Sequence, residues 1–362
     1  MIDWVRGLRF LGVALLLTLT SSCQIGYLFK SGYYQMKLLS KRVPVEKVLQ
    51  DPKIDESIKA QLRIAQEARK FSEEVLKLNS SKNYTSYVQL DQPYVSYVVS
   101  ASPKWKLEHH LWSFPMVGDL PYKGFYNESE AKEQEQELQE KNLDTYLRGV
   151  SAYSTLGWFD DPILSSMIHY KDYQLVNTII HETVHATLYI KSSADFNERM
   201  AVFLGNKGTE LFYLKKEGAD SKTLKQIQKE NDDDKIFSAF ISDEIQNLKS
   251  WYQQTSQSSS TEADRNKHFA LIKDHFQKNI LPQMKTGNYK NFQKMELNNA
   301  RLLLFKTYMQ DLSDFQKLFD LTKQNFTEFL KCCEKLKKQD QPEEGLKKIA
   351  ADLSTSGLSI CH

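Results

Sequence analysis

Five consecutive residues, His181-Glu182-Thr183-Val184-His185, combine two imidazoles and a carboxylate at a spacing that suits metal-assisted hydrolysis. On a helix, residues four apart lie on one face, so both histidines can reach one zinc ion. Glu182 lies one position round the helix, where its carboxylate can contact a metal-bound water without binding the metal. Zinc lowers the pKa of that water, and Glu182 can accept its proton as the water attacks a carbonyl. The motif therefore predicts zinc-dependent hydrolysis with Glu182 as general base.

A catalytic zinc site needs a third protein ligand and one open position. Glu198 is the candidate, because the segment 191–195 allows a turn and the next helix can bring Glu198 back toward His181 and His185. Two antiparallel helices would then share one metal, an arrangement that resembles the glutamate-zincins such as thermolysin. In the alternative, Asp195 and Glu198 have capping-box-like spacing, and Glu198 only caps its own helix.

The elements that must position these residues form an α+β fold that is mainly α-helical, with a small β-sheet. We expect one metallopeptidase domain over residues 23–362. It divides into an N-terminal helical arm at 26–78, a β-rich part at 84–155 and a catalytic and C-terminal helical part at 165–362. Residues 145–155 read as a strand. The predicted helices after the arm are 128–142, 172–191, 195–215, 235–255, 262–285, 290–310 and 313–337.

Composition limits the class of partner. The chain has 362 residues with 48 basic and 46 acidic side chains, a formal charge of +2. This near-balance gives no electrostatic reason to expect nucleic acid as a partner. The hydrophobic fraction of 41% is that of a soluble globular protein with a sizeable core. The oligomeric state stays open.

The N-terminus has the pattern of an export signal. Arg6 and Arg9 precede an apolar run at 10–19, which is too short to span a membrane, and small polar residues lead to Cys23. A cysteine at this place resembles the lipobox of bacterial lipoproteins. We therefore predict a signal peptide at 1–22 and lipidation at Cys23, the alternatives being an ordinary signal peptide or an uncleaved anchor.

Lipidation at Cys23 would attach the protein to a membrane of the cell envelope. The next residue is Gln24 rather than aspartate. In a two-membrane bacterium this favours the periplasmic side of the outer membrane. The predicted partners are thus a membrane, through the N-terminal lipid, and a peptide substrate.

Three further cysteines are Cys332, Cys333 and Cys361. An exported protein sits in an oxidising compartment, so Cys361 can bridge to either member of the adjacent pair. The spacing does not decide the pairing, and none of it suits a cysteine zinc site.

A family resemblance extends along nearly the whole mature chain. The matching stretches are Tyr33-Tyr34, Ala68 to Phe71, Ser86 to Tyr94, Ser102-Pro103, Phe114-Pro115, Pro121 to Phe125, Ala152 to Pro162, the HExxH segment, Phe196-Asn197-Glu198 with Ala201, and Asn298 to Leu302. With these residues the chain resembles the bacterial predicted aminopeptidases, lipoproteins with an HExxH zinc site. The resemblance implies a zinc metallopeptidase, and aminopeptidase action rests on it alone. One departure is that Ser113 and Asp119 stand where relatives often carry cysteines.

Two matching segments outside the zinc helices are candidates for lining the site. Tyr153 can donate a hydrogen bond to the developing oxyanion, or be a packed strand tyrosine. Asp160 or Asp161 can orient a ligand histidine, or only begin the turn before Pro162.

A third segment offers side chains for binding substrate. Asn298 and Asn299 can bind substrate backbone, or cap the helix that follows them. Arg301 can neutralise a carboxylate, or lie on a solvated face. These three are substrate-binding candidates.

Two other functions remain open at this stage. One is an envelope-anchored binding or scaffold lipoprotein with a structural zinc, whose coordination would be closed by a fourth ligand. Glu182 argues against it, since a closed site has no use for an acid beside the metal. The other is a zinc hydrolase acting on a non-peptide carbonyl, because an activated water attacks many carbonyls.

Overall fold

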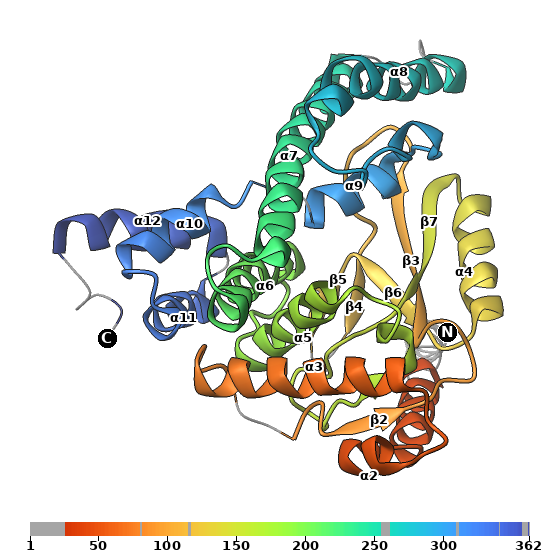
Figure 1. The fold of residues 1–362 in the computed structure, drawn as a ribbon. Coiled ribbons are helices and arrows are strands. Elements are labelled where there is room, and N and C mark those ends of the chain that lie inside the picture. Colours follow the sequence, from red (N-terminus) through yellow and green to blue (C-terminus); the bar gives the residue numbers. More distant parts are fainter. Residues whose placement is uncertain are drawn as a thin grey trace, which may run out of the picture.

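The computed structural model describes residues 26–79, 82–114, 117–254, 261–308, 311–339, 341–356 and 361. This part of the chain is mainly helical with small β-sheets, so the predicted α+β fold is confirmed (Figure 1). The predicted signal peptide at 1–22 and Cys23 lie outside the described residues. No helix within those ranges is long and apolar enough to cross a lipid bilayer.

The N-terminal arm contains a helix at 26–40, α2 (Val45–Gln50) and α3 (Glu56–Glu74). α3 begins where the carboxylate of Asp55 accepts a hydrogen bond from the backbone N–H of Ser57 at 2.7 Å. Its apolar residues Leu62, Ala65 and Ala68 recur every three positions and are fully buried. This face of α3 packs against α5 (Asp172–Thr187), the helix that carries the HExxH motif.

The main sheet is antiparallel with strand order β6–β3–β7. Its strands are β3 (Ser96–Pro103), β6 (Tyr122–Phe125) and β7 (Leu143–Val150). Helix α4 (Glu128–Glu140) covers one face, where Ala131 and Leu138 pack against Tyr97, Val99 and Ala101. The predicted strand 145–155 is β7, which starts two residues earlier than expected and ends at Val150. The other face of the sheet points toward α5.

Five short strands form two smaller sheets. One has the order β1–β2–β8, from β1 (Val43–Pro44), β2 (Ser86–Val88) and β8 (Ile163–Leu164). The other is the hairpin of β4 (Trp112–Phe114) and β5 (Gly118–Leu120). In this hairpin Ser113 lies directly opposite Asp119, and the Ser113 hydroxyl donates a hydrogen bond to the carboxylate. The two positions that depart from the family pattern are therefore cross-strand neighbours.

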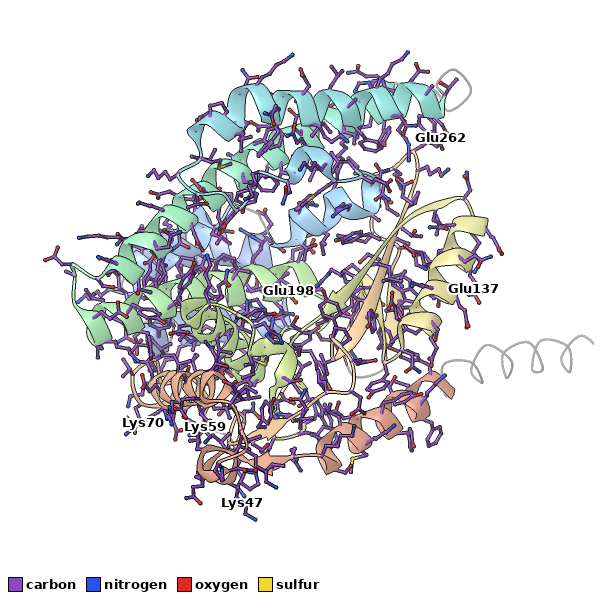
Figure 2. All side chains as sticks on the ribbon, turned by 45° about the vertical axis from the view of Figure 1, so that its right-hand side comes forward. Lys47, Lys59, Lys70, Glu137, Glu198 and Glu262 are labelled. Atoms are coloured by element: carbon purple, nitrogen blue, oxygen red, sulfur yellow. A yellow bond between two sulfur atoms is a disulfide. The ribbon has the colours of Figure 1, made fainter. Side chains whose placement is uncertain are left out.

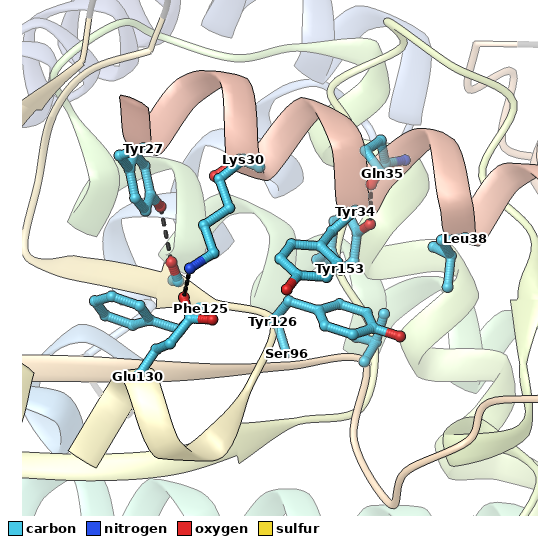
Figure 3. Close-up of a pocket in the computed structure, with 13 residues that line it drawn as sticks. Tyr27, Lys30, Tyr34, Gln35, Leu38, Ser96, Phe125, Tyr126, Glu130 and Tyr153 are labelled. Atoms are coloured by element: carbon cyan, nitrogen blue, oxygen red, sulfur yellow. Dashed lines mark hydrogen bonds and ion pairs between the residues drawn. The ribbon is translucent and has the colours of Figure 1, made fainter. Parts of the chain in front are cut away.

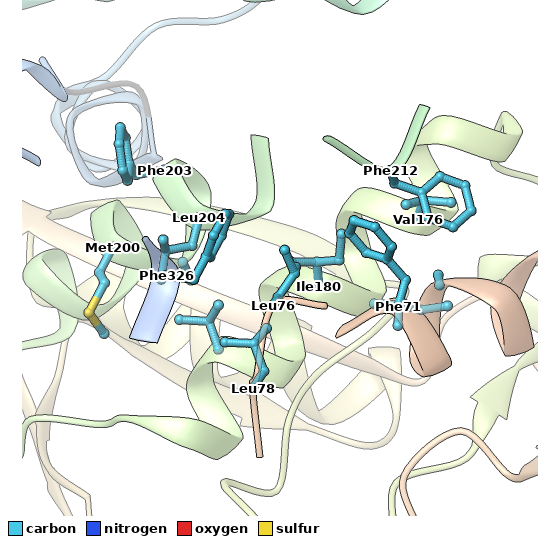
Figure 4. Packing of buried hydrophobic residues seen from close by; sticks show 14 of the residues in the cluster. Phe71, Leu76, Leu78, Val176, Ile180, Met200, Phe203, Leu204, Phe212 and Phe326 are labelled. Carbon is cyan, nitrogen blue, oxygen red and sulfur yellow. The ribbon is translucent and has the colours of Figure 1, made fainter. Parts of the chain in front are cut away.

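Helices α5 and α6 (Ala194–Glu217) pack closely and run antiparallel. Glu198 lies beside His185, and further along α6 Gly208 lies beside Ile180. The core beneath them is formed by apolar side chains from α3 and the segment after it, α5, α6 and the C-terminal helices, which include Phe71, Leu76, Val176, Leu204, Phe212 and Phe326 (Figure 4). This packing fixes the two helices that carry the predicted ligands.

The remaining helices depart from the predicted bounds. They are α7 (Lys222–Gln254), α8 (Glu262–His275), α9 (Asn299–Tyr308), α10 (Ser313–Leu321), α11 (Phe326–Glu334) and α12 (Pro342–Ser356). The predicted helix 235–255 begins earlier, at Lys222. The predicted helix 262–285 ends as regular α-helix at His275 and continues as a π turn and a 3₁₀ turn. The predicted helix 290–310 corresponds to α9, which begins nine residues later than expected, at Asn299.

The prediction of a single helix at 313–337 is wrong, because two helices, α10 and α11, occupy this range. Lys323 and Gln324 have φ angles of 56° and 57°, the left-handed conformation that ends a helix. The backbone N–H of Gln324 then donates to the carbonyl of Phe319, which satisfies a carbonyl at the end of α10. The chain turns at this point and starts again as α11.

The cysteine pairing that the sequence left open is decided by the fold. Cys332 of α11 forms a disulfide with Cys361, and Cys333 is a buried free thiol. Adjacent helical residues point in directions about 100° apart, so only one of the pair can face the C-terminal segment.

Candidate metal centre and its cavity

Three side chains from α5 and α6 bring their ligand atoms together. The Nε2 atoms of His181 and His185 are 3.1 Å apart. Oε2 of Glu198 lies 3.4 Å from Nε2 of His181 and 3.6 Å from Nε2 of His185. Glu198 occupies the interior of the molecule, between the helical part and the sheet (Figure 2).

These separations fit one tetrahedral zinc ion. Ligand atoms about 2.0–2.1 Å from zinc at tetrahedral angles lie roughly 3.3 Å from one another. Two imidazole nitrogens and one carboxylate oxygen are ligands that zinc accepts, and within the described ranges the group contains these three side chains. An ion bound here would therefore have three protein ligands and one coordination position left open.

The turn before Glu198 is held by its neighbour Asn197, which is buried. The Asn197 amide accepts a hydrogen bond from the backbone N–H of Ile190 at 2.9 Å and donates one to the carbonyl of Ile190 at 2.7 Å. This pair of bonds closes the connection between α5 and α6. The alternative that Glu198 only caps its helix is not observed, because the N-cap is Ser193 and no side chain bonds there.

The two histidines act strongly on Glu198. Burial by itself would raise the pKa of this carboxyl, but the charge of His185 and hydrogen bonds from both histidines outweigh it and hold the pKa well below its usual range. Glu198 is therefore an anion at neutral pH, the form that binds a metal.

Glu182 has the opposite shift. Burial raises the pKa of its carboxyl to about 7, the charge of His181 lowers it, and Glu198 and Asp161 raise it further. The backbone of Ser154 acts in the opposite direction and lowers the pKa of this carboxyl. Two glutamates in one cavity thus have different proton affinities, a pattern that separates a proton-transferring acid from a permanent anion.

The three ligands and Glu182 open onto a cavity of about 620 Å³. Its walls come from one face of the β6–β3–β7 sheet, the connection 151–156, α5 and α9. This volume is within the usual range for small-molecule sites. The candidate centre is thus accessible to a substrate and not enclosed by protein.

The family described as "Putative aminopeptidase" matches residues 26–347, most of the chain. The chain belongs to this family. No match was found among curated proteins or among solved structures. Membership of this aminopeptidase family indicates a peptidase-like function for the chain.

Tyr153, from the segment shared with the aminopeptidase family, lines this cavity and also a second one of about 290 Å³ beneath the helix at 26–40. Its hydroxyl donates a hydrogen bond to the side-chain carbonyl of Gln35 (Figure 3). Burial raises the pKa of Tyr153, with a further contribution from the charge of Asp161, so the hydroxyl stays protonated. Tyr153 is thus placed at the site, with its proton directed to the N-terminal helix.

Asp161 is buried, and its carboxylate accepts hydrogen bonds from the backbone N–H and the hydroxyl of Thr155, at 2.9 and 2.8 Å. It therefore holds the connection that lines the cavity, and these bonds go to Thr155 instead of a ligand histidine. Asp160 contributes its backbone carbonyl, which accepts a hydrogen bond from Arg42. The structure does not bring either carboxylate into contact with His181 or His185.

The predicted substrate-binding group lies outside the cavity lining. Asn299 is buried and donates to the carbonyls of Pro103 and Lys104, and Asn298 donates to the carbonyl of Thr145. The Asn298 side chain also accepts from the backbone N–H of Arg301 at the start of α9. Asn298 therefore matches the capping alternative, whereas the side chain of Asn299 bonds to distant segments and does not cap α9.

Arg301 stacks on a tyrosine of the sheet. Its guanidinium carbon lies 4.6 Å from the ring centre of Tyr146. Asn298, Asn299 and Arg301 therefore attach α9 to β3 and β7.

Among the cavity residues that the sequence did not indicate, Tyr189 and Arg148 carry polar groups suited to chemistry. Tyr189 lies just after α5, and burial together with the charge of Glu198 raises its pKa to about 12. Arg148 lies on β7. Tyr189 follows His185 by four positions and could have been considered from that spacing. Arg148 could not be found from the sequence, because only the pairing of the strands brings it to the cavity.

Proposed function

We propose that this chain is a zinc-dependent peptidase of the cell envelope, with His181, His185 and Glu198 as zinc ligands and Glu182 as general base. The observation that carries the proposal is the convergence of three ligand atoms within 3.6 Å of one another beside an acid. Membership of the aminopeptidase family supports peptide-bond hydrolysis as the reaction.

In the proposed hydrolysis, each residue of the site has a separate role. A zinc ion bound here would supply an activated water and polarise the scissile carbonyl. Glu182 would accept a proton from the water and deliver it to the leaving amine. Glu198 and the histidines would hold the ion, and the face of the sheet that lines the cavity opposite α5 would position the peptide.

The envelope location rests on the N-terminal sequence. A lipid on Cys23 would anchor the protein to a membrane, on the periplasmic side of the outer membrane in a two-membrane bacterium. The Cys332–Cys361 disulfide supports export, because such bonds persist in oxidising compartments.

The experiment that tests the proposal is the zinc content of the soluble chain starting after Cys23, measured with its hydrolysis of a peptide library. We expect one zinc per chain in the parent and in Glu182→Gln, and weak or no zinc binding in Glu198→Ala. Hydrolysis should be lost in both variants. Glu210→Ala, in the same helix but hydrogen-bonded to Asn231, is the matched control and should keep both zinc and activity.

Three outcomes would count against the proposal. Full zinc retention by folded Glu198→Ala would remove Glu198 as a ligand. No zinc in the parent after incubation with the metal would rule out the proposed zinc-dependent enzyme. Bound zinc with no peptide hydrolysis would favour the non-peptide substrate or the scaffold function.

A further inference from the structure

One face of the helix at 26–40 is attached to the rest of the protein. The Tyr27 hydroxyl donates a hydrogen bond to the carbonyl of Gly124 at 2.8 Å, and the Tyr34 ring stacks on Tyr126 with ring centres 4.2 Å apart. Leu38 is buried. Figure 3 shows the side chains of Tyr27 and Tyr34 directed from this helix toward the strands below it. The spacing of seven and four places these three residues on one side of the helix.

The opposite face is apolar and exposed. Phe29, Tyr33 and Met36 have exposed fractions of 77%, 64% and 58%, and at 3.6 residues per turn they lie within about 60° of one another around the helix. A Cβ at Gly32, on the same side, would meet no atom within 4 Å. With Leu28, this helix carries four of the eleven large apolar side chains that are exposed in the described part of the chain. Such a concentration marks a contact surface, whereas single exposed apolar residues do not.

The charge of this region is positive. Four basic residues and no acidic residue lie between Cys23 and Val45, and the basic residues are Lys30, Lys37, Lys41 and Arg42. Two of them form ion pairs, with Glu130 and with Asp91. Four positive charges less these two negative ones leave +2. The exposed apolar face is therefore combined with a surplus of positive charge.

The position of the helix in the chain indicates what covers this face. Gly26 follows Cys23 by three residues, which reach at most about 10 Å when extended. A lipid on Cys23 would thus hold the first turn of the helix at the bilayer surface. The three exposed side chains by themselves offer less than the roughly 800 Å² that each partner buries in a stable protein interface, which disfavours a second copy of the chain.

We propose that the helix at 26–40 lies flat on a bilayer that contains anionic phospholipid, with Phe29, Tyr33 and Met36 inserted at its surface. An exposed apolar stripe, an aromatic side chain with a polar tip and basic residues are the features of helices that bind in this way. The inference rests on the membrane attachment in the proposed function and is independent of peptide hydrolysis. The bilayer would lie on the side of the helix away from Tyr27 and Tyr34.

The test measures co-sedimentation of the soluble chain starting after Cys23 with two kinds of vesicle. One contains phosphatidylcholine and phosphatidylglycerol, and the other phosphatidylcholine alone. We expect binding to the anionic vesicles that is weaker with the neutral ones and weaker at high salt. The double variant Phe29→Ser with Tyr33→Ser should lower the partition coefficient by about 10-fold or more, because two apolar side chains no longer leave water.

A matched control removes two apolar side chains elsewhere. Leu214→Ser with Leu271→Ser, at positions 43% and 62% exposed on α6 and α8, should bind vesicles as the parent does. A second readout locates the contact. An environment-sensitive fluorophore on Tyr33→Cys should shift its emission to the blue with anionic vesicles, and the same fluorophore on Leu271→Cys should not. Urea unfolding checks that both double variants keep the stability of the parent, as expected for exposed positions.

Two results would overturn the proposal. One is the absence of vesicle binding by the parent, or equal binding by the parent and the folded Phe29→Ser, Tyr33→Ser variant. The other is a parent that is a dimer in sedimentation velocity and a monomer in this variant, which would assign the face to a second copy. Vesicle binding needs neither zinc nor substrate, so binding as expected without peptide hydrolysis would overturn only the peptidase function.

Discussion

Residue identity alone does not decide what a carboxylate does in this cavity. Glu182 and Glu198 have the same side chain, yet the pKa of Glu182 is raised to about 7 chiefly by burial, and that of Glu198 is held low by two adjacent imidazoles. Under the proposed function, these environments would suit Glu182 to exchange a proton and Glu198 to bind the metal as an anion.

The first prediction concerns the donor that stabilises the oxyanion. Tyr189 lies in the cavity next to Glu198, whereas the Tyr153 hydroxyl is already donated to Gln35. We expect Tyr189→Phe to lower kcat by about 100-fold with zinc retained, the usual cost of removing one oxyanion donor. Tyr153→Phe should lower kcat by less than about 10-fold. Steady-state kinetics with zinc analysis checks this, and the reverse order would return the role to Tyr153.

The second prediction concerns Asp161 and pH. Burial raises the pKa of its carboxyl to about 6, against hydrogen bonds from Thr155 that lower it. This folded-state pKa is above the unfolded value of about 3.9. The contribution of Asp161 to the free energy of unfolding is therefore fully present below about pH 4, where its carboxyl is protonated, and is lost as the pH rises through 6. The free energy of unfolding of Asp161→Asn, relative to the parent, should therefore increase by up to about 3 kcal/mol between pH 4 and pH 7.

Urea unfolding of the zinc-free proteins at the two pH values measures this change. Asp160→Asn is the neighbouring control and should change by less than about 1 kcal/mol. A relative stability of Asp161→Asn that does not vary with pH would show that Asp161 ionises normally in the folded protein.

At the scale of elements, the candidate metal centre depends on how closely α5 and α6 approach. Two glycines of α6 face α5 and differ in the room around them. A Cβ at Gly208 would lie 2.9 Å from Cδ1 of Leu76 and 3.0 Å from Cγ2 of Ile180, both fully buried. A Cβ at Gly205 would lie 3.5 Å from its nearest atoms, on Asn177 and His181, which is ordinary contact.

We therefore predict opposite outcomes for two matched substitutions. Both gain about 0.8–1 kcal/mol of helix propensity when alanine replaces glycine. Gly208→Ala also overpacks the interface, so it should be less stable than Gly205→Ala by about 1–3 kcal/mol. Denaturant unfolding of the zinc-free proteins provides the comparison, and equal stabilities would mean that Leu76 and Ile180 move aside freely.

At the scale of the whole molecule, the helical regions are joined to the sheet and to each other by a few specific links. Asp144 of β7 and Arg265 of α8 are both buried and form two hydrogen bonds, at 2.9 and 2.8 Å. The Cys332–Cys361 disulfide ties the C-terminal segment to α11, across a sequence separation of 29. These links connect parts of the chain that local packing would leave independent.

The fourth prediction tests the disulfide. Closing a loop of this length removes conformational entropy from the unfolded chain worth about 3–4 kcal/mol. We expect Cys361→Ser to lose approximately this much stability in guanidinium unfolding. Reductant should destabilise the parent by a similar amount and leave Cys361→Ser unchanged, and an effect of reductant on the variant would point to a bond involving Cys333.

The sequence by itself determined what is encoded by local spacing. Histidines four apart fix a common helix face, and a short turn followed by a helix returns Glu198 to them, so the proximity of these three side chains was predictable from a segment of eighteen residues, 181–198. The same local rules gave the mainly helical α+β class. They failed at 313–337, where two residues with positive φ end a helix that the apolar pattern continues.

The tertiary structure decided everything that depends on contacts between distant segments. Arg148 enters the cavity only because β7 pairs with β3 in the observed register, and Tyr153 meets Gln35 across 118 positions. Asn299 was a candidate for binding substrate, but its side-chain amide donates hydrogen bonds to the backbone carbonyls of Pro103, at the end of β3, and of Lys104, the residue that follows. Such pairings depend on which faces pack together, and a one-residue change in register would turn Arg148 to the opposite side of the sheet.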